Sequence, residues 1–245
     1  MRKVFFSIIT ATKNPENILP TLKSLKKQNT RNYENIIIDS SSKQIEPDIK
    51  KKFKFRYFYN KKFSLYQALN FGIKQSKGEV IFFLHSDDVL SSKKILRIVH
   101  QNFKQKKNEI LYGNINMIAK KFNRLWISGK FKKEKIFQGW HPPHTAFFCK
   151  RDMFYKYGFF KTQYSIASDY ELILRFLLST NEKKIKYIPV SIINMKIGGK
   201  SSKSLINIIR SNIEVVQILK NLNFKNYYKV TFQKIISKIF QIRFK

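Results

Sequence analysis

The chain has 245 residues, and 43% of them are hydrophobic, including 23 Phe and 12 Tyr. Such a chain can bury a substantial core, which excludes a largely disordered protein. Lys and Arg number 49 against 15 acidic residues, and the net charge of +34 indicates an anionic partner: nucleic acid, an acidic membrane surface or a phosphorylated substrate. A general bias toward Lys, Ile and Asn explains the same charge without any binding role.

Two further classes of protein are excluded by composition. The single cysteine, Cys149, makes an intrachain disulfide impossible, which fits a reducing compartment. It lies in the apolar run AFFC, so a buried structural thiol is expected rather than a nucleophile. No window of about 20 apolar residues occurs, so no membrane-spanning helix is predicted.

The first part of the chain alternates strands and helices. Apolar runs of strand length lie at residues 4–12, 35–42, 55–59 and 80–84. Apolar residues at helical spacing lie at 16–28 and at 64–78, where Gly78 fits a helix end. This order is typical of an α/β sheet with mainly parallel strands.

Polar side chains stand where three of these strands end: Thr10 and Thr12, then Asp39, then Asp87 and Asp88. Ligands of such sheets bind outside the carboxyl ends of the strands. We therefore expect the three strand ends to meet at one edge and to form a binding site there.

Asp87 and Asp88 are adjacent carboxylates, which repel each other unless a cation lies near them. Mg²⁺ and Mn²⁺ prefer carboxylate oxygen and often bridge to substrate phosphates. The pair is thus a candidate handle for a nucleoside diphosphate. The alternative is a solvated turn in which Asp88 caps the helix predicted at 91–103.

A second candidate site lies in the helix predicted over 165–179. Asp169 stands near its start, where a capping residue is expected. A helix N-terminus also stabilises the carboxylate form, so Asp169 is a candidate general base, with Glu171 a weaker substitute. Further along, Arg175 is either structural or faces a phosphate.

His141 and His144 flank two prolines in the segment 138–152. Their spacing would let both reach a metal, but the rigid Pro-Pro pair makes a shared site awkward. The alternatives are a substrate-lining role or plain loop histidines.

The end of the chain is different in character. Residues 184–204 predict an edge strand and a Gly-Gly turn, and two amphipathic helices follow. The first has the apolar stripe Leu205, Ile209, Ile213, Val216 and Leu219. The second has the stripe Tyr228, Phe232, Ile235, Ile236 and Ile239 and the cations Lys225, Lys229, Lys234, Lys238, Arg243 and Lys245. The first could pack on the domain; we expect the second, over 225–245, to lie on an anionic membrane surface.

Five ordered pieces of the sequence resemble the family 2 glycosyltransferases, which have the nucleotide-sugar-binding fold called GT-A. They are SIITATKNPENILPTLKSLKKQN, IIIDSSS, SLYQALNFGIKQSKGEVIFFLHSDD, HPPHTAFFCKRDMFYKYGFF and IASDYELILRF. The resemblance covers residues 4 to about 200. It implies a mixed, mainly parallel α/β sheet flanked by helices over residues 1–204, with a helical appendage at 205–245.

The resemblance also implies roles on the donor side. Thr10 and Thr12 would line the nucleotide pocket and Asp39 would contact the base. Asp87 would lie near the ribose, and Asp88 would coordinate Mn²⁺ or Mg²⁺. Two departures exist: Asp39 is followed by Ser-Ser-Ser-Lys, and the form Ser-Asp-Asp leaves open which carboxylate touches the ion.

On the other side of the site, the resemblance implies that Asp169 is the catalytic base. His144 matches a position in the acceptor segment, and Lys200 lies in a segment that closes over the diphosphate. His144 and Lys200 are therefore expected on the acceptor or diphosphate side, and Arg175 joins them if it faces a phosphate.

The resemblance thus implies an inverting glycosyltransferase that uses a nucleotide-diphospho-sugar, expected to be UDP-linked. The acceptor would be a hydroxyl of a saccharide or of a lipid-linked molecule in cell-surface polysaccharide biosynthesis. The expected location is the cytoplasm, peripheral on the inner face of the membrane.

Two alternatives remain open. One is a basic nucleic-acid-binding protein, although no recognised nucleic-acid-binding motif occurs and the lysines form no single stripe, so specific nucleic-acid binding is not expected. The other is a catalytically inactive scaffold, which the joint presence of Asp39, Asp87, Asp88 and Asp169 disfavours.

Overall fold

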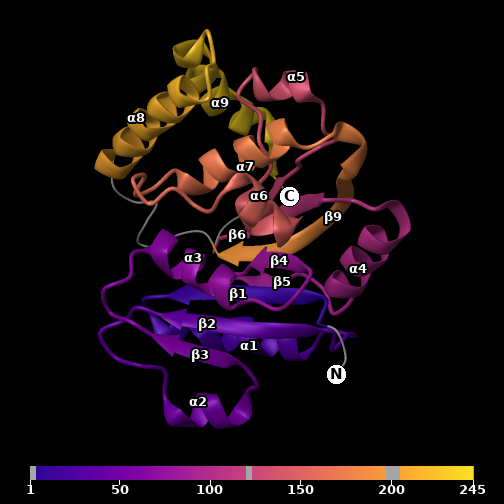
Figure 1. The fold of residues 1–245 in the computed structure, drawn as a ribbon, viewed down its shortest axis with the longest axis vertical. Helices are drawn as coiled ribbons and strands as arrows, with labels where there is room; N and C mark the ends of the chain where they lie inside the picture. Colours follow the sequence, from indigo (N-terminus) through magenta and orange to yellow (C-terminus); the bar gives the residue numbers. More distant parts are fainter. Residues whose placement is uncertain (1–3, 120–122, 197–204, 245) are drawn as a thin grey trace.

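The computed structural model describes residues 4–119, 123–196 and 205–244. Its strands form one mixed sheet, with helices on both faces (Figure 1). The strands are β1 Phe6–Thr12, β2 Tyr33–Asp39, β3 Arg56–Tyr59, β4 Val80–Phe83, β5 Val89–Leu90, β6 Ile110–Ile118, β7 Asn123–Trp126, β8 Phe147–Lys150, β9 Ile185–Lys196 and β10 Ile242–Phe244. The helices are α1 Ile18–Lys26, α2 Pro47–Lys52, α3 Leu65–Gln75, α4 Ile95–Lys106, α5 Lys133–Ile136, α6 Asp152–Tyr157, α7 Ser168–Ser179, α8 Leu205–Asn221 and α9 Tyr227–Gln241. Short 3-10 turns occur at Pro15–Asn17, His144–Ala146 and Glu182–Lys184.

The strand order is β10-β7-β6-β8-β4-β1-β2-β3, with β9 beside β6 and β5 beside β9. The strands β3, β2, β1 and β4 are parallel, and β8 runs antiparallel between β4 and β6. The predicted α/β architecture is confirmed, and all of the antiparallel pairings involve a strand from the second half of the chain.

Strand register sets the position of the site. Thr12 of β1 pairs with Asp39 of β2, and Ile9 of β1 pairs with Phe83 of β4. Because these strands are parallel and in step, the carboxyl ends of β1, β2 and β4 lie at one edge of the sheet. The predicted convergence of the three strand ends is therefore confirmed.

The core lies on both faces of the sheet because successive strand residues point to opposite sides. In β4, Ile81 and Phe83 join a core cluster that includes residues of α3, α7 and α8, whereas Val80 and Phe82 join a cluster with α4. The β4 segment is apolar throughout because both faces of this central strand are covered.

Gly78 does not close the helix as expected. α3 begins with a capping box between Ser64 and Gln67 and ends at Gln75. A Cβ at Gly78 would lie 2.5 Å from the backbone nitrogen of Ser7, so a glycine is required there by the close approach of β1.

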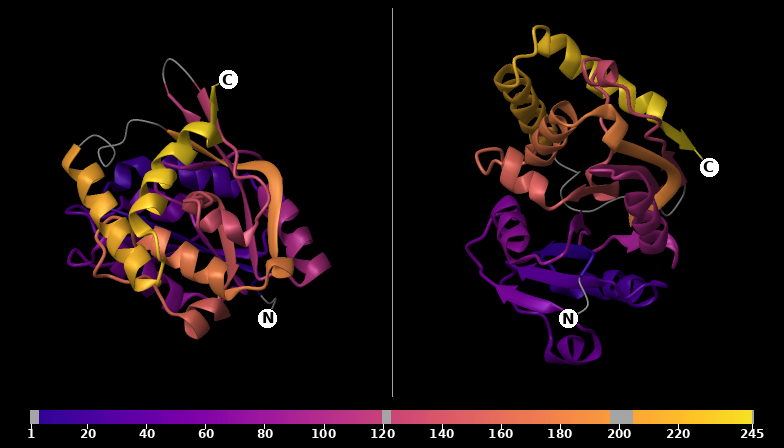
Figure 2. Two further views of the ribbon diagram at one scale, coloured as in Figure 1. Left: turned by 90° about the horizontal axis from the view of Figure 1, so that it is seen from above. Right: turned by 45° about the vertical axis from the view of Figure 1, so that its right-hand side comes forward.

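Two predictions about the end of the chain are wrong. β9 is not an edge strand, because it pairs with β6 on one side and with β5 on the other. The second C-terminal helix ends at Gln241, and β10 then pairs antiparallel with β7. The first C-terminal helix, α8, packs on the domain: Val215, Ile218 and Leu219 are fully buried in the same core as α7 (Figure 2).

The helices that the structure describes include none long and apolar enough to cross a membrane.

Candidate active site

The first wall of the site is the end of β1 with the loop after β2. Thr10 and Thr12 are buried, and the Thr12 carbonyl accepts a hydrogen bond from the Ser40 amide at 2.8 Å. Thr12 pairs with Asp39 in the sheet, so both residues lie at the edge where the sequence predicts a nucleotide.

Asp39 is fully buried and accepts four hydrogen bonds. They come from the amide and the hydroxyl of Ser41 at 2.9 and 2.5 Å, from the Ile45 amide at 3.2 Å and from the Tyr57 hydroxyl at 2.7 Å. A carboxylate offers about four acceptor sites, so this one is saturated. Burial and the charge of Asp39 raise the pKa of Tyr57, which keeps its hydroxyl a donor. Asp39 thus ties the loop after β2 to β3.

The second wall is the turn that follows β4. The Asp88 amide donates to the His85 carbonyl at 3.2 Å. From α1, the Thr21 hydroxyl lies 2.8 Å from the Asp88 carbonyl and 3.3 Å from that of His85. Thr21 was not predicted, and no sequence signal marked it; it fixes the turn that presents both aspartates.

Within this turn the two aspartates differ. Asp87 is exposed, whereas Asp88 is 1% exposed and its Oδ2 has no hydrogen-bond partner. Burial, with a smaller effect of the Asp87 charge, raises the pKa of Asp88 to about 7. Asp88 does not cap α4, whose N-cap is Lys94 without a side-chain cap bond. A buried carboxylate oxygen without a partner is costly, and a bound cation would offset that cost.

A chain of three side chains connects this turn with the second half of the protein. His144 Nδ1 lies 3.0 Å from Asp169 Oδ2, and His144 Nε2 lies 2.8 Å from His85 Nε2. Burial and the neighbouring His144, partly opposed by Asp169, lower the pKa of His85 to about 4, so this ring is neutral near pH 7. His85 was not predicted to act here, although it is the first polar residue after the β4 strand.

Asp169 is held but remains accessible. Its Oδ1 accepts from the Tyr170 amide at 2.9 Å and lies 3.3 Å from the Tyr66 hydroxyl, which also meets the Ile166 carbonyl at 2.6 Å. The side chain is 27% exposed. The N-cap of α7 is Ala167 and has no side-chain cap bond, so Asp169 is not the cap that the alternative interpretation required.

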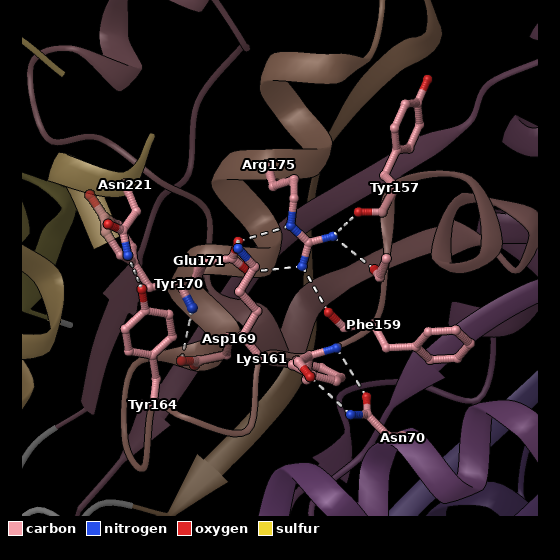
Figure 3. A network of polar contacts seen from close by, with 12 residues as sticks. Asn70, Tyr157, Phe159, Lys161, Tyr164, Asp169, Tyr170, Glu171, Arg175 and Asn221 are labelled. Atoms are coloured by element: carbon pink, nitrogen blue, oxygen red, sulfur yellow. Dashed lines mark hydrogen bonds and ion pairs between the residues drawn. The ribbon is translucent and has the colours of Figure 1, made fainter. Parts of the chain in front are cut away.

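Arg175 lies in a saturated network on α7 (Figure 3). It forms a bidentate ion pair with Glu171, with distances of 2.9 and 2.8 Å. Its other donors reach the carbonyls of Tyr157, Gly158 and Phe159. All five guanidinium N–H groups are thus engaged. This favours the structural alternative for Arg175, and the same ion pair occupies Glu171.

Glu214 of α8 supports the segment before Asp169. Its carboxylate accepts from the amide and hydroxyl of Ser165 at 2.8 and 2.7 Å, and from the amides of Ile166 and Ala167 at 2.9 and 2.8 Å. It satisfies backbone donors that lead into the first turn of α7. It was not predicted, yet one signal existed: it is the sole acidic residue after position 204.

The remaining candidates lie elsewhere. His141 is buried, with its ring against Trp126 and Tyr170 at centroid distances of 5.8 and 5.0 Å, and Lys200 lies outside the described residues. Within 4–119, 123–196 and 205–244, no three His, Cys, Asp or Glu side chains are grouped to hold a metal ion. The unpartnered Oδ2 of Asp88 is a ligand that a hard ion accepts, and such ions often take further ligands from phosphates and water.

Comparison with known proteins agrees with this geometry. Residues 7–165 match the family model "Glycosyl transferase family 2". The chain belongs to this family. The match covers both walls of the site up to the loop that Glu214 holds.

Curated relatives of this family 2 glycosyltransferase include the "PGL/p-HBAD biosynthesis glycosyltransferase" of Mycobacterium bovis. It is 25% identical over 183 residues, which are 71% of this chain and 70% of the relative.

Two solved structures share the GT-A fold of this family 2 glycosyltransferase. The 1–349 fragment of Staphylococcus aureus TarS superposes with a TM-score of 0.69 at 16% identity, covering 94% of this chain and 70% of the fragment. The same fragment is known in complex with UDP and with UDP-GlcNAc. The mannosyltransferase PcManGT of Pyrobaculum calidifontis, solved with GDP-Man and Mn²⁺, superposes with a TM-score of 0.65 at 13% identity, covering 94% and 68%.

Proposed function

We propose that this enzyme is an inverting glycosyltransferase that moves a sugar from a nucleotide-diphospho-sugar, expected to be UDP-linked, to an acceptor hydroxyl. One observation carries the proposal: contacts run without a break from the Asp88 turn through His85 and His144 to Asp169. A candidate metal ligand and a candidate base, far apart in sequence, therefore share one site.

The donor nucleotide would bind at the ends of β1 and β2. Thr10 and Thr12 would line its pocket, Asp39 would read the base, and Asp87 would meet the ribose. Because Asp39 is saturated, base binding requires one partner to leave, and the half-buried Tyr57 hydroxyl can leave by rotation of its side chain. The UDP complexes of TarS support a uridine donor.

Asp88 would hold Mn²⁺ or Mg²⁺ through its unpartnered oxygen. Such an ion acts as a Lewis acid that stabilises charge on a departing diphosphate. The complex of PcManGT with Mn²⁺ supports this assignment.

Asp169 would act as the general base. The acceptor oxygen forms a bond to the anomeric carbon from the face opposite the diphosphate, the bond from that carbon to the phosphate oxygen breaks, and the hydroxyl proton passes to Asp169. His144 would hold the carboxylate through Oδ2, and Tyr66 and the Tyr170 amide restrain Oδ1. Fixing the base in this way limits the reorganisation needed during reaction.

The acceptor would be a saccharide or a lipid-linked molecule of cell-surface glycan biosynthesis, reached from the cytoplasmic face of the membrane. The name of the mycobacterial relative, a biosynthetic glycosyltransferase, supports a biosynthetic role. An anionic membrane surface fits the net charge of +34.

The deciding experiment is calorimetric titration of UDP and of GDP, each with and without Mn²⁺, into the wild type and into Asp88→Ala. We expect metal-dependent binding of UDP that is lost in the variant. Metal-dependent binding of GDP alone would indicate a GDP-linked donor in place of a UDP-linked one. Binding of neither nucleotide would contradict an active transferase and favour the inactive scaffold; salt-dependent RNA binding would then favour the nucleic-acid alternative.

A further inference from the structure

Large apolar side chains are exposed mainly on the C-terminal hairpin of α8 and α9. Among the described side chains, eleven large hydrophobic residues are exposed, and seven of them lie on these two helices: Ile206, Ile208, Ile209, Ile213, Tyr228, Phe232 and Ile235. Single exposed apolar residues are normal on a protein surface, whereas a concentration of them marks an interaction site.

On α8 the exposed residues form a stripe. Ile206, Ile209 and Ile213 are 67, 61 and 54% exposed, and their spacing of three and four residues puts them on one side of the helix. The opposite side of α8 carries the buried Val215 and Ile218. The helix is therefore apolar on both sides, and its partner inside the molecule covers only one of them.

On α9 a second stripe is exposed. Tyr228, Phe232 and Ile235 are 66, 63 and 47% exposed at spacings of four and three residues. The buried side of α9 includes Val230 and Lys234, whose ammonium lies over the ring of Tyr170 at 4.9 Å. Lys234 was expected on the membrane-facing surface, and this expectation is wrong. Helices α8 and α9 pack against each other along one side of the molecule (Figures 1 and 2).

The charge of the hairpin indicates which kind of partner would bind the exposed surface of α8 and α9. From residue 205 to 245 the sequence has eight Lys and Arg residues and one acidic residue, Glu214, which is buried and fully hydrogen-bonded. Exposed cations, among them Arg210, Lys225 and Lys229, accompany the apolar stripes. A second copy of this chain carries the same charge of +34 and is repelled, whereas an anionic surface is attracted.

We propose that the exposed stripes of α8 and α9 form a docking surface for an anionic lipid membrane, with Ile206, Ile209 and Ile213 inserted among the lipids. Apolar residues that enter the boundary between headgroups and acyl chains, next to cations that attract anionic lipids, are the two contributions to such binding. The proposal extends docking from the predicted second helix to α8, which the structure leaves half uncovered.

Hydrogen bonds connect helix α8, which carries this surface, to the segment that precedes Asp169. Glu214, on the buried side of α8, holds Ser165, Ile166 and Ala167, which precede Asp169. A membrane bound to α8 would therefore lie on the same rigid support as the candidate base. This consequence for a lipid-linked acceptor rests on the proposed function, whereas membrane binding itself does not.

The test is flotation of the full-length protein with two kinds of vesicle: phosphatidylcholine alone, and phosphatidylcholine with about 30% phosphatidylglycerol, each in about 0.1 M and about 0.5 M NaCl. The variants are Ile209→Gln with Ile213→Gln on α8, and Phe232→Gln on α9. Tyr155→Gln on α6 is the matched control, because Tyr155 is also exposed but lies outside the hairpin. Circular dichroism checks that each variant is folded.

We expect the wild type to float with the anionic vesicles and to do so less at high salt. The α8 double variant should lower the partition coefficient about ten-fold or more, Phe232→Gln should lower it less, and Tyr155→Gln should leave it unchanged. Equal flotation of the wild type and the double variant would overturn the proposal, because charge alone would then explain binding.

Light scattering on the same samples tests whether a second copy of the chain covers the surface instead. A wild-type dimer that the double variant converts to a monomer, without flotation of either, would assign the surface to a second copy and also overturn the proposal. UDP titration of the same variants keeps the two proposals apart: flotation without UDP binding contradicts the proposed function alone, and UDP binding without flotation contradicts this inference alone.

Discussion

At the scale of single residues, the candidate site depends on how each ionisable group is paired. Asp39 has four partners, Asp169 has three, and one oxygen of Asp88 has none. Arg175, which has every donor in use, cannot take up a phosphate without giving up a contact with Glu171 or with a backbone carbonyl. The carboxylate oxygen without a hydrogen-bond partner is thus on Asp88. Asp169 is the hydrogen-bonded carboxylate that solvent still reaches.

Asp88→Asn should abolish Mn²⁺-dependent nucleotide binding. In the wild type only the carboxylate binds the ion, and its pKa is raised to about 7, so Mn²⁺ affinity should fall about ten-fold per pH unit below 7 and level off above it. Titration calorimetry at several pH values checks this. A pH-independent affinity would show that Asp88 is not the ligand.

The same variant should stabilise the metal-free protein. A carboxyl whose folded pKa is raised contributes stability at low pH that is lost as the pH rises through about 7. Asn avoids the buried charge, so the gain at pH 8 should be on the order of 2–4 kcal/mol and should shrink near pH 5. Urea unfolding in EDTA measures it. The exposed Asp87→Asn is the control and should change little.

Asp169→Asn should lower kcat about 10²–10⁴-fold and leave UDP affinity unchanged, because it removes the base but not the nucleotide pocket. His144→Leu should lower kcat less, since it leaves the carboxylate in place and removes the ring that contacts Asp169 Oδ2 and His85 Nε2. His144→Asn keeps a donor near the position of Nδ1 and should restore most of the loss. Steady-state kinetics check all three, and a failure of the Asn variant to recover would indicate that the imidazole itself moves the proton.

At the scale of elements, α7 and α8 form a unit through Glu214. Helix α7 begins without a side-chain cap of its own, and the segment before it donates three amides and a hydroxyl to Glu214. The Asp88 turn has a comparable support, since Thr21 of α1 holds its carbonyls. Each candidate catalytic carboxylate is thus positioned by a polar side chain from a neighbouring helix.

Glu214→Gln should lower the free energy of unfolding by about 1–3 kcal/mol, because one amide oxygen replaces a carboxylate that serves four donors. Burial tends to raise the pKa of Glu214, but the hydrogen bonds from Ser165, Ala167 and Ile166 together lower it. The stability it contributes is therefore present above its ordinary pKa of 4.5 and lost as the pH falls below that value. Urea unfolding of both proteins at pH 7 and near pH 4 should show the difference shrink; a constant difference would contradict the carboxylate's role.

At the scale of the whole molecule, the C-terminal hairpin completes the core. Val215, Ile218, Leu219, Phe224 and Val230 belong to the same buried cluster as the residues of α7, and β10 extends the sheet beside β7. The division into a domain at 1–204 and a tail at 205–245 remains a prediction, but the packing indicates that the tail does not fold apart from the domain.

A chain truncated after residue 204 should therefore lose several kcal/mol of stability, since it exposes a set of buried aliphatic side chains at about 1.5–3 kcal/mol each. We expect it to aggregate or to unfold well below the wild-type midpoint. Thermal unfolding followed by circular dichroism measures this. A truncated chain that unfolds at the wild-type temperature would establish 1–204 as an independent domain.

Elements with a local pattern could be predicted from the amino-acid sequence. Apolar runs and helical spacing predicted β1, β2, β3, β4, α3 and α7, because burial on a sheet or helix face repeats along the chain. Polar residues after the apolar runs predicted the site edge at Thr12, Asp39 and Asp88, because parallel strands end together.

The side-chain partners of the site residues could be found only from the folded structure. His85 meets His144 across 59 positions, and Glu214 meets Ala167 across 47. Such contacts form only when folding brings distant segments together, and they produce no repeating pattern in the sequence. For the same reason, the sequence of α8 did not show that Ile209 and Ile213 would be exposed whereas Val215 and Ile218 would be buried.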